Sequence, residues 1–251
     1  MKKKLAAILL FVLSAFAVHA SANVYWNTYA PFAVMYHRIS DTETEDAFTI
    51  TVDSFESDIK YLAENGYTFC TSSEFDERIK KGDTEKIIAI TFDDGYTSDI
   101  EIAFPILEKY NAKATCFVIG ELIGADGYMS GEQLAELAAS KHIEIGNHSY
   151  SLHNMRSEQV ESFYHSADFT LAYADFVKNK EILEDITGKN VRAVSYPWGL
   201  YGRYFDSLLK ESGMITFSSA EQTAVDTNLP YGRFNRAADM SIEKIISRAK
   251  S

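Results

Sequence analysis

The chain has 251 residues, of which 46% are hydrophobic and 13% aromatic, so it can bury a sizeable core, and general disorder is excluded. Its formal net charge of −12 disfavours nucleic acids and anionic membranes as partners. A neutral or cationic polymer is compatible with this charge, and so is an acidic surface that only keeps the protein soluble.

The first 22 residues are expected to be a secretory signal peptide. A basic start, MKKK, precedes an apolar run over 5–18, and residues 18–20 and 20–22 read Val-His-Ala and Ala-Ser-Ala, which suits a signal peptidase. The run is shorter than the roughly 20 residues that span a bilayer. We therefore expect residues 23–251 to form an exported monomer without a membrane span, located in a periplasm, in the cell wall or outside the cell.

The predicted elements begin with a buried strand over 32–36 that ends at His37. An acidic loop over 40–47 and an amphipathic helix over 52–62 follow, and then a strand near 67–70 and a short helix near 73–81. Residues 86–92 are an apolar run without alternation, which indicates a strand buried on both faces.

Beyond residue 92, strands and helices alternate. Helices are predicted over 98–110, 130–139, 168–187, 203–212 and 241–249, and strands over 113–119, 142–146, 191–196 and 214–217. This alternation is typical of parallel βαβ units. About seven such strands, with no repeat and no Pro/Gly-rich linker, favour an α/β fold made of a single domain, a closed or distorted (β/α)7-type barrel.

The only cysteines, Cys70 and Cys116, both lie in apolar, strand-like stretches. An oxidising destination allows them to pair, but the sequence does not show whether their strands are neighbours. Two buried thiols and a disulfide therefore both remain open. A catalytic thiol is disfavoured because no activating base lies nearby in the sequence.

Polar side chains follow several of the predicted strands. Asp93 and Asp94 come after the strand over 86–92, and His148 and His153 come after the strand over 142–146. In parallel α/β folds the carboxyl ends of the strands share one face, where sites gather. Asp-Asp-Gly alone is a good turn sequence. Together with two imidazoles it describes a metal site of two nitrogens and one oxygen, with the second carboxylate free to act as a base.

These residues resemble the metal-dependent polysaccharide deacetylases, carbohydrate esterase family four, whose shared unit is the NodB-homology domain. Residues 91–95, Thr-Phe-Asp-Asp-Gly, match the first motif of that family, His148-Ser149 opens the second, and residues 196–199, Tyr-Pro-Trp-Gly, look like the third. The segment Lys113–Gly120 resembles the strand after the first motif. The resemblance extends over nearly all of the chain beyond the signal, so residues 23–251 are expected to be one deacetylase domain.

The sequence departs from the family pattern in the histidine motifs. The two histidines of the second motif are normally four residues apart, whereas His148 and His153 are five apart. Only a bulged loop would let both reach one ion. The late Leu-x-His motif is absent, and Met35–His37 resembles its permuted equivalent in the branch that includes exported poly-N-acetylglucosamine deacetylases.

A third departure concerns an arginine that orients the catalytic aspartate in the family. The expected positions hold Val194 and Ser195. Arg233 is a candidate to compensate, although an arginine on the surface is an equal alternative.

The resemblance implies a hydrolase that removes N-acetyl groups from an amino-sugar polymer. The implied metal ligands are Asp94, His148 and His153, and the divalent ion is expected to be zinc, with cobalt or nickel as alternatives. Asp93 would take a proton from the activated water, and His37 would give one to the departing amine. The backbone N–H of Trp198 would meet the developing oxyanion.

Substrate binding is assigned to four residues, Tyr96, Tyr196, Trp198 and Arg233. Aromatic faces stack on sugars, although the same rings could equally pack the mouth of the barrel. The permuted layout leans toward poly-N-acetylglucosamine or peptidoglycan over chitin. Two alternatives remain: an esterase that removes O-acetyl groups, and a non-catalytic glycan-binding protein, against which the presence of Asp93 and His37 speaks.

Overall fold

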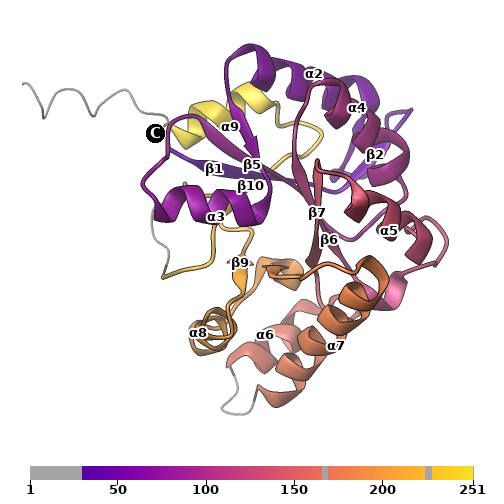
Figure 1. Cartoon of the computed structure of the whole chain (residues 1–251), viewed down its shortest axis with the longest axis vertical. Helices are drawn as coiled ribbons and strands as arrows, with labels where there is room; N and C mark the ends of the chain where they lie inside the picture. Colours follow the sequence, from indigo (N-terminus) through magenta and orange to yellow (C-terminus); the bar gives the residue numbers. More distant parts are fainter. Residues whose placement is uncertain (1–29, 166–168, 224–227, 251) are drawn as a thin grey trace, which may run out of the picture.

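A parallel β-sheet that curves into a nearly closed barrel forms the centre of the molecule (Figure 1). The computed structural model describes residues 30–165, 169–223 and 228–250, so the expected signal peptide lies outside the described residues. The seven strands of the barrel are β1 Phe32–Tyr36, β5 Ile87–Phe92, β6 Ala114–Val118, β7 Ile143–Asn147, β8 Ala193–Ser195, β9 Ile215–Phe217 and β10 Arg233–Asn235. The predicted α/β class and the distorted (β/α)7-type barrel in a single domain are confirmed.

The strands lie side by side in the order β10, β1, β5, β6, β7, β8, β9, and every ladder between them is parallel. A parallel bridge between Phe217 and Tyr231 brings the two edges together. Strand β4, Thr68–Cys70, pairs with the start of β5, and a separate two-stranded sheet joins β2, Arg38–Ser40, to β3, Thr49–Thr51. Strand β10 was not predicted from the sequence.

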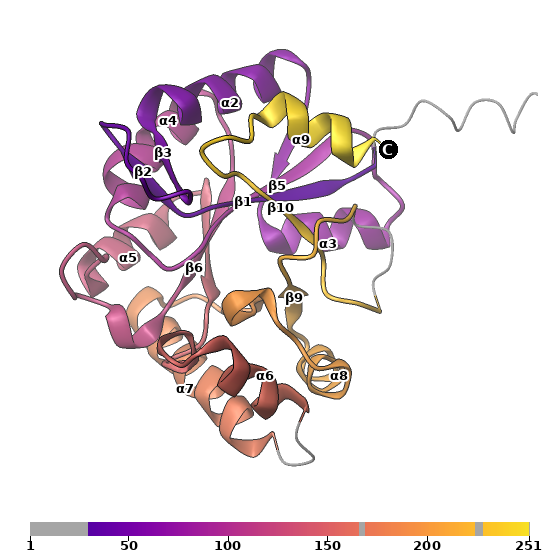
Figure 2. The same cartoon turned by 180° about the vertical axis from the view of Figure 1, so that it is seen from behind.

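Helices cover the outside of the barrel. They are α2 Val52–Glu64, α3 Ser72–Lys80, α4 Phe104–Lys109, α5 Gly131–Ala139, α6 Ser157–His165, α7 Thr170–Thr187, α8 Arg203–Glu211 and α9 Ile242–Ala249. Figure 2 shows α2, α4 and α9 gathered at one end of the molecule and α6, α7 and α8 at the other. None of the helices within the described residues is long and apolar enough to cross a bilayer.

Local signals explain where several helices begin and end. Helix α3 starts at a capping box in which Thr71 and Glu74 bond each other's backbone N–H groups, and α5 starts at the same arrangement of Ser130 and Gln133. Helix α7 ends at Gly188, whose φ of 64° is the left-handed conformation that glycine adopts without cost.

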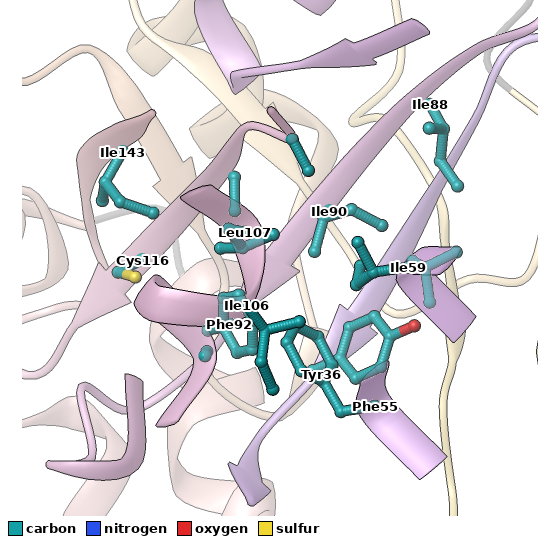
Figure 3. Close-up of a cluster of buried hydrophobic side chains, with 14 of the residues drawn as sticks. Tyr36, Phe55, Ile59, Ile88, Ile90, Phe92, Ile106, Leu107, Cys116 and Ile143 are labelled. Carbon is teal, nitrogen blue, oxygen red and sulfur yellow. The ribbon is translucent and has the colours of Figure 1, made fainter. Parts of the chain in front are cut away.

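The apolar strand β5 is buried on both faces, as predicted. Its residues Ile88, Ile90 and Phe92 belong to the core outside the barrel, where they pack with Phe55 of α2 and Leu107 of α4 (Figure 3). Its residues Ile87 and Ala89 belong instead to the core inside the barrel. Successive side chains of a strand point to opposite faces, so the two sets alternate along β5.

The same alternation selects the polar side chains that reach the inside of the barrel at its carboxyl end. Two residues beyond Ala89 is Thr91, and two residues beyond that is Asp93. Ser195 follows the inner residue Ala193 in β8 by the same interval. The barrel therefore carries apolar side chains along its length and a polar layer at the end where the site lies.

Cys70 and Cys116 are both free and buried, which decides between the two alternatives in favour of thiols. Burial raises the pKa of Cys70 to about 11 and that of Cys116 well above its ordinary value. Neither thiol is therefore poised to act as a nucleophile.

Candidate active site

A pocket of about 480 Å³ opens at the carboxyl ends of the barrel strands. Asp93 and Asp94 enter it after β5, His37 after β1 and His148 after β7. The N–H of Asp93 donates to the carbonyl of Tyr36, so the ends of β1 and β5 are locked together. The sequence-predicted catalytic and metal-binding residues thus lie in one pocket.

Asp93 is held in a buried network of strand-end side chains. The guanidinium of Arg233 in β10 donates to both of its oxygens, with Nη1 at 2.6 Å from Oδ1 and Nη2 at 2.8 Å from Oδ2. The hydroxyl of Ser195 donates to Oδ2 at 3.2 Å, and Arg233 also donates to Ser195 and to Thr91. This forked pairing fixes the plane of the carboxylate.

The charge state of Asp93 follows from this pairing. Burial raises the pKa of a carboxyl group, but the charge and the hydrogen bonds of Arg233 outweigh burial here and hold the pKa of Asp93 well below its ordinary value. Asp93 is therefore ionised, and Arg233 sets the orientation of its carboxylate.

Asp94, His148 and His153 converge on a common point. The Nε2 atoms of His148 and His153 lie 3.5 Å and 3.6 Å from Oδ1 of Asp94, and one ligand atom from each of the three residues lies within 4.8 Å of the others. Zinc–ligand bonds of about 2.0–2.2 Å at tetrahedral angles separate neighbouring ligand atoms by roughly 3.4 Å. The spacing of these three side chains suits a small divalent cation.

The hydrogen bonds of the same groups provide an independent test of that fit. Nδ1 of His148 lies 2.9 Å from the carbonyl oxygen of Ser195, which can only accept, so Nδ1 carries the proton and Nε2 presents a lone pair. Burial lowers the pKa of His148, although Asp93 and Asp94 oppose this, and so favours the neutral ring. Oδ1 of Asp94 is buried and has no hydrogen-bond partner among the described residues. Lone pairs that face one another without a proton between them fit a bound cation.

A bulged loop brings the two histidines to the same point despite their five-residue spacing. Ser149 has a φ of 68°, in the left-handed region, and residues 152–154 form a short 3₁₀-helix that carries His153. The ring of His153 stacks on the indole of Trp198, with centroids 4.8 Å apart and planes 20° apart. Trp198 itself has a φ of 61° and donates from Nε1 to the carbonyl of Met155.

Three of the four predicted substrate-binding residues line the pocket, and the fourth, Arg233, does not. Tyr96 and Trp198 line the pocket, and 49% of the Trp198 side chain is exposed. Tyr196 also lines the pocket, but it is buried and its hydroxyl donates to Asp206. Arg233 is fully buried on Asp93, so its assignment to substrate binding is corrected: it contacts the aspartate and not the pocket.

One wall of the pocket, formed by the segment around β2 and β3, was not predicted from the sequence. Arg38, Asp46 and Phe48 line it, with the Phe48 ring 5.0 Å from the ring of His37 and the Arg38 guanidinium 4.3 Å from the ring of Tyr96. The available signal in the sequence was a phenylalanine, Phe48, directly after the acidic loop over 40–47. The short β2–β3 sheet, which folds this loop back, could not be recognised from three-residue strands.

Comparisons with known proteins point to one family. The family described as polysaccharide deacetylase matches residues 80–217. YxkH of Bacillus subtilis (strain 168), which carries the name of a polysaccharide deacetylase, is 31% identical over 182 residues, which are 70% of this chain and 58% of that protein. A poly-β-1,6-N-acetyl-D-glucosamine N-deacetylase of Staphylococcus aureus (strain N315) is 29% identical over 187 residues, or 72% of this chain and 64% of that protein. The chain thus matches under two thirds of the length of these curated relatives.

Solved structures share the fold. IcaB from Ammonifex degensii has a TM-score of 0.74 and 26% identity, and the match covers 88% of this chain and 97% of that one. The deacetylase PplD of Streptococcus pyogenes, solved in complex with acetate, has a TM-score of 0.76 at 20% identity, over 89% of this chain and 99% of that one, and shows the fold alone. From the family match together with the relatives, the chain belongs to the polysaccharide deacetylase family.

Proposed function

We propose that the protein is a metal-dependent hydrolase that removes N-acetyl groups from an amino-sugar polysaccharide. The observation that carries this proposal is the convergence of Asp94, His148 and His153 beside an ionised Asp93 in one pocket. The Staphylococcus aureus relative is named for poly-β-1,6-N-acetyl-D-glucosamine, which makes a polymer of N-acetylglucosamine the first substrate to try.

The proposed metal ligands are Asp94, His148 and His153, and zinc is the preferred ion, with cobalt and nickel as alternatives. A divalent ion bound there supplies a Lewis acid that polarises the acetamide carbonyl and lowers the pKa of a water molecule. The fit of the ligand set rests on the lone pair of His148 and on the unpaired oxygen of Asp94.

Asp93 and His37 are the proposed proton carriers. Asp93 accepts a proton as the water oxygen bonds to the acetyl carbon, and Arg233 keeps the carboxylate turned toward the pocket. His37 lines the same pocket and donates a proton to the nitrogen as the amide C–N bond breaks. The backbone N–H of Trp198 is the proposed oxyanion donor. The products are acetate and a free amine on the sugar.

The exposed aromatic side chains at the pocket are the proposed sugar contacts. Trp198 is 49% exposed and Phe48 is 46% exposed, and Tyr96 also lines the pocket. We further propose that residues 1–22 direct export to the periplasm, the cell wall or the medium, and that the mature chain acts as a monomer. Mass spectrometry of the exported chain checks the signal peptide, since the mature N-terminus should follow Ala20 or Ala22.

The deciding experiment measures acetate released from N-acetylglucosamine oligomers by the purified protein, after chelation and after addition of zinc, cobalt or nickel. Asp93→Asn should lower kcat by at least 100-fold because the amide cannot accept the proton. Asp185→Asn, the same change at an exposed position of α7, should leave the rate unchanged.

The outcomes separate the candidate functions. Acetate release from an O-acetylated polysaccharide but not from the N-acetylated oligomers would make the protein an esterase. Binding of the oligomers without release, with every metal tested, would make it a glycan-binding protein. Release that chelation does not affect would contradict the metal site.

A further inference from the structure

The segment between the two site histidines, residues 149–151, has its backbone N–H groups bonded by side chains. Asn147 accepts from the N–H of Ser149 at 2.9 Å. Asp175, on the neighbouring helix α7, accepts from the N–H of Tyr150 at 2.7 Å through Oδ1 and from the N–H of Ser151 at 3.0 Å through Oδ2. The hydroxyl of Ser151 donates to the same Oδ2 at 2.9 Å. One carboxylate thus takes three hydrogen bonds from two consecutive residues.

The carbonyl groups of the same segment are bonded from the other side. The N–H of Gly120 donates to Ser149, and the N–H of Glu121 donates to Tyr150. A Cβ at position 120 would lie 2.1 Å from Oδ1 of Asn179 and 2.9 Å from the ring of Tyr150, so only glycine allows this close approach. The segment is therefore clamped between the residues after β6 and one turn of α7.

A second part of α7 supports the clamp. Asn179 is fully buried and donates to the carbonyl of Val118 and to Oδ1 of Asn147, and Asn147 donates to the carbonyl of Phe176. Asn147 therefore connects α7 to the N–H of Ser149, where the backbone takes its left-handed turn. Without the acceptors on Asn147 and Asp175, the backbone N–H groups of residues 149–151 would lose their hydrogen-bond partners.

We propose that Asp175 is a positioning residue that sets the place of His153 relative to His148 and so tunes the affinity of the metal site. The inference rests on the proposed function, because it assumes that the two histidines bind one ion. His148 is fixed independently: its side chain is 2% exposed and its Nδ1 is bonded to Ser195. The side chain of His153 is 23% exposed, and its position depends on the segment that Asp175 holds.

The geometry also explains why the five-residue spacing is compatible with a metal site. Successive N–H groups of a strand point to opposite sides, whereas here one carboxylate from another element receives the N–H groups of two consecutive residues. Residues that orient metal ligands from behind commonly change metal affinity by about 10–100-fold when they are replaced. Asp175 touches neither the pocket nor the proposed ion, so its effect would pass through the backbone of the segment.

The test measures binding of Co²⁺ alone to the metal-free protein, by calorimetry and by the visible absorption spectrum of the bound ion. Asp175→Ala should weaken Co²⁺ binding by about 10–100-fold and change the spectrum, because the geometry at His153 relaxes. Asp175→Asn should produce a smaller loss, since its amide oxygen still accepts from one N–H group. Asp185→Asn is the matched control on the same helix and should bind Co²⁺ as the unaltered protein does.

Circular dichroism of the metal-free variants shows whether each one is folded at the temperature of the titration. If Asp175→Ala does not fold, Asp175→Asn decides the question. A folded variant of Asp175 with the affinity and spectrum of the unaltered protein would overturn this inference and leave the proposed function standing. An unaltered protein that does not bind Co²⁺ would overturn both.

Discussion

The two halves of the site are held in different ways. Asp93, Ser195 and Arg233 lie at strand ends, are at most 3% exposed, and bond to one another directly. The segment that carries His153 leaves β7, and its backbone is bonded by side chains and amides of other elements. The first half is a continuation of the barrel core, whereas the second is a loop shaped by its neighbours.

This difference predicts different failures. A change in the strand-end half should remove a partner from a buried charge, and so should cost stability along with activity. A change in the loop half should leave the core intact and shift only the placement of one proposed ligand.

The largest effect is expected for Arg233→Met, which leaves the Asp93 carboxylate buried without its cation. Breaking a buried pair from one side typically costs about 3–5 kcal/mol of folding free energy. We expect a loss of this size in urea unfolding at pH 7, together with a severe loss of acetate release. Arg233→Lys should recover only part of either, because an ammonium group cannot reproduce the fork of the guanidinium.

At acidic pH the difference in the free energy of unfolding between the unaltered protein and Arg233→Met should become smaller. The pKa of Asp93 is lowered in the fold, so its pairing stabilises the protein above the ordinary aspartate pKa of about 3.9, and this stabilisation is lost as the pH falls further. Arg248→Met, which removes the cation of an exposed pair with Glu221, serves as the control and should cost about 1 kcal/mol or less. Equal losses for the two variants would contradict the role given to Arg233.

The second effect concerns the buried carboxyl group of Asp99, whose pKa is influenced by Asp93 and Asp94 at the end of β5. Asp99 is 1% exposed, and neither of its oxygens has a hydrogen-bond partner among the described residues. Burial, assisted by Asp94 and Asp93, raises its pKa well above the ordinary value. Asp99→Asn should therefore stabilise the protein at pH 8 by about 1–3 kcal/mol, because the amide has no charge to bury and no proton to retain.

The sign of this effect depends on pH. Between the ordinary aspartate pKa of about 3.9 and the raised pKa in the fold, the folded state holds a proton that the unfolded state has released, so stability falls as the pH rises. Urea unfolding at pH 4 should show little difference between Asp99→Asn and the unaltered protein, and the difference should grow toward pH 8. Asp126→Asn, at an exposed position, should show no such trend. A variant that is less stable at pH 8 would mean that the Asp99 carboxylate has a binding partner.

The same contrast explains what the sequence could and could not predict. Strand ends could be predicted: the apolar run over 86–92 indicated β5, and Asp93 and Asp94 were expected at its carboxyl end. The pairing of Arg233 with Asp93 was only one of two open alternatives, because Arg233 lies 140 residues away on a three-residue strand with no pattern of its own. The five-residue histidine spacing pointed to a bulge, but its causes, Asp175 and the left-handed Ser149, come from tertiary contacts that local propensity does not show.

The smallest effect is expected at the outer edge of the loop half, where the indole of Trp198 stacks on the ring of His153. Aromatic stacking contributes about 0.5–1.5 kcal/mol, so Trp198→Leu should weaken Co²⁺ binding by roughly two- to tenfold. Trp198 is 49% exposed and its φ of 61° is as unfavourable for leucine as for tryptophan, so the free energy of unfolding should change little. Calorimetric titration with Co²⁺ checks the affinity, and Tyr204→Leu, at an aromatic residue that is 82% exposed, is the control.

An unchanged affinity in Trp198→Leu would assign the placement of His153 to the backbone alone. A loss as large as that of Asp175→Ala would instead mean that the loop half depends on side-chain packing as strongly as the strand-end half depends on its ion pair.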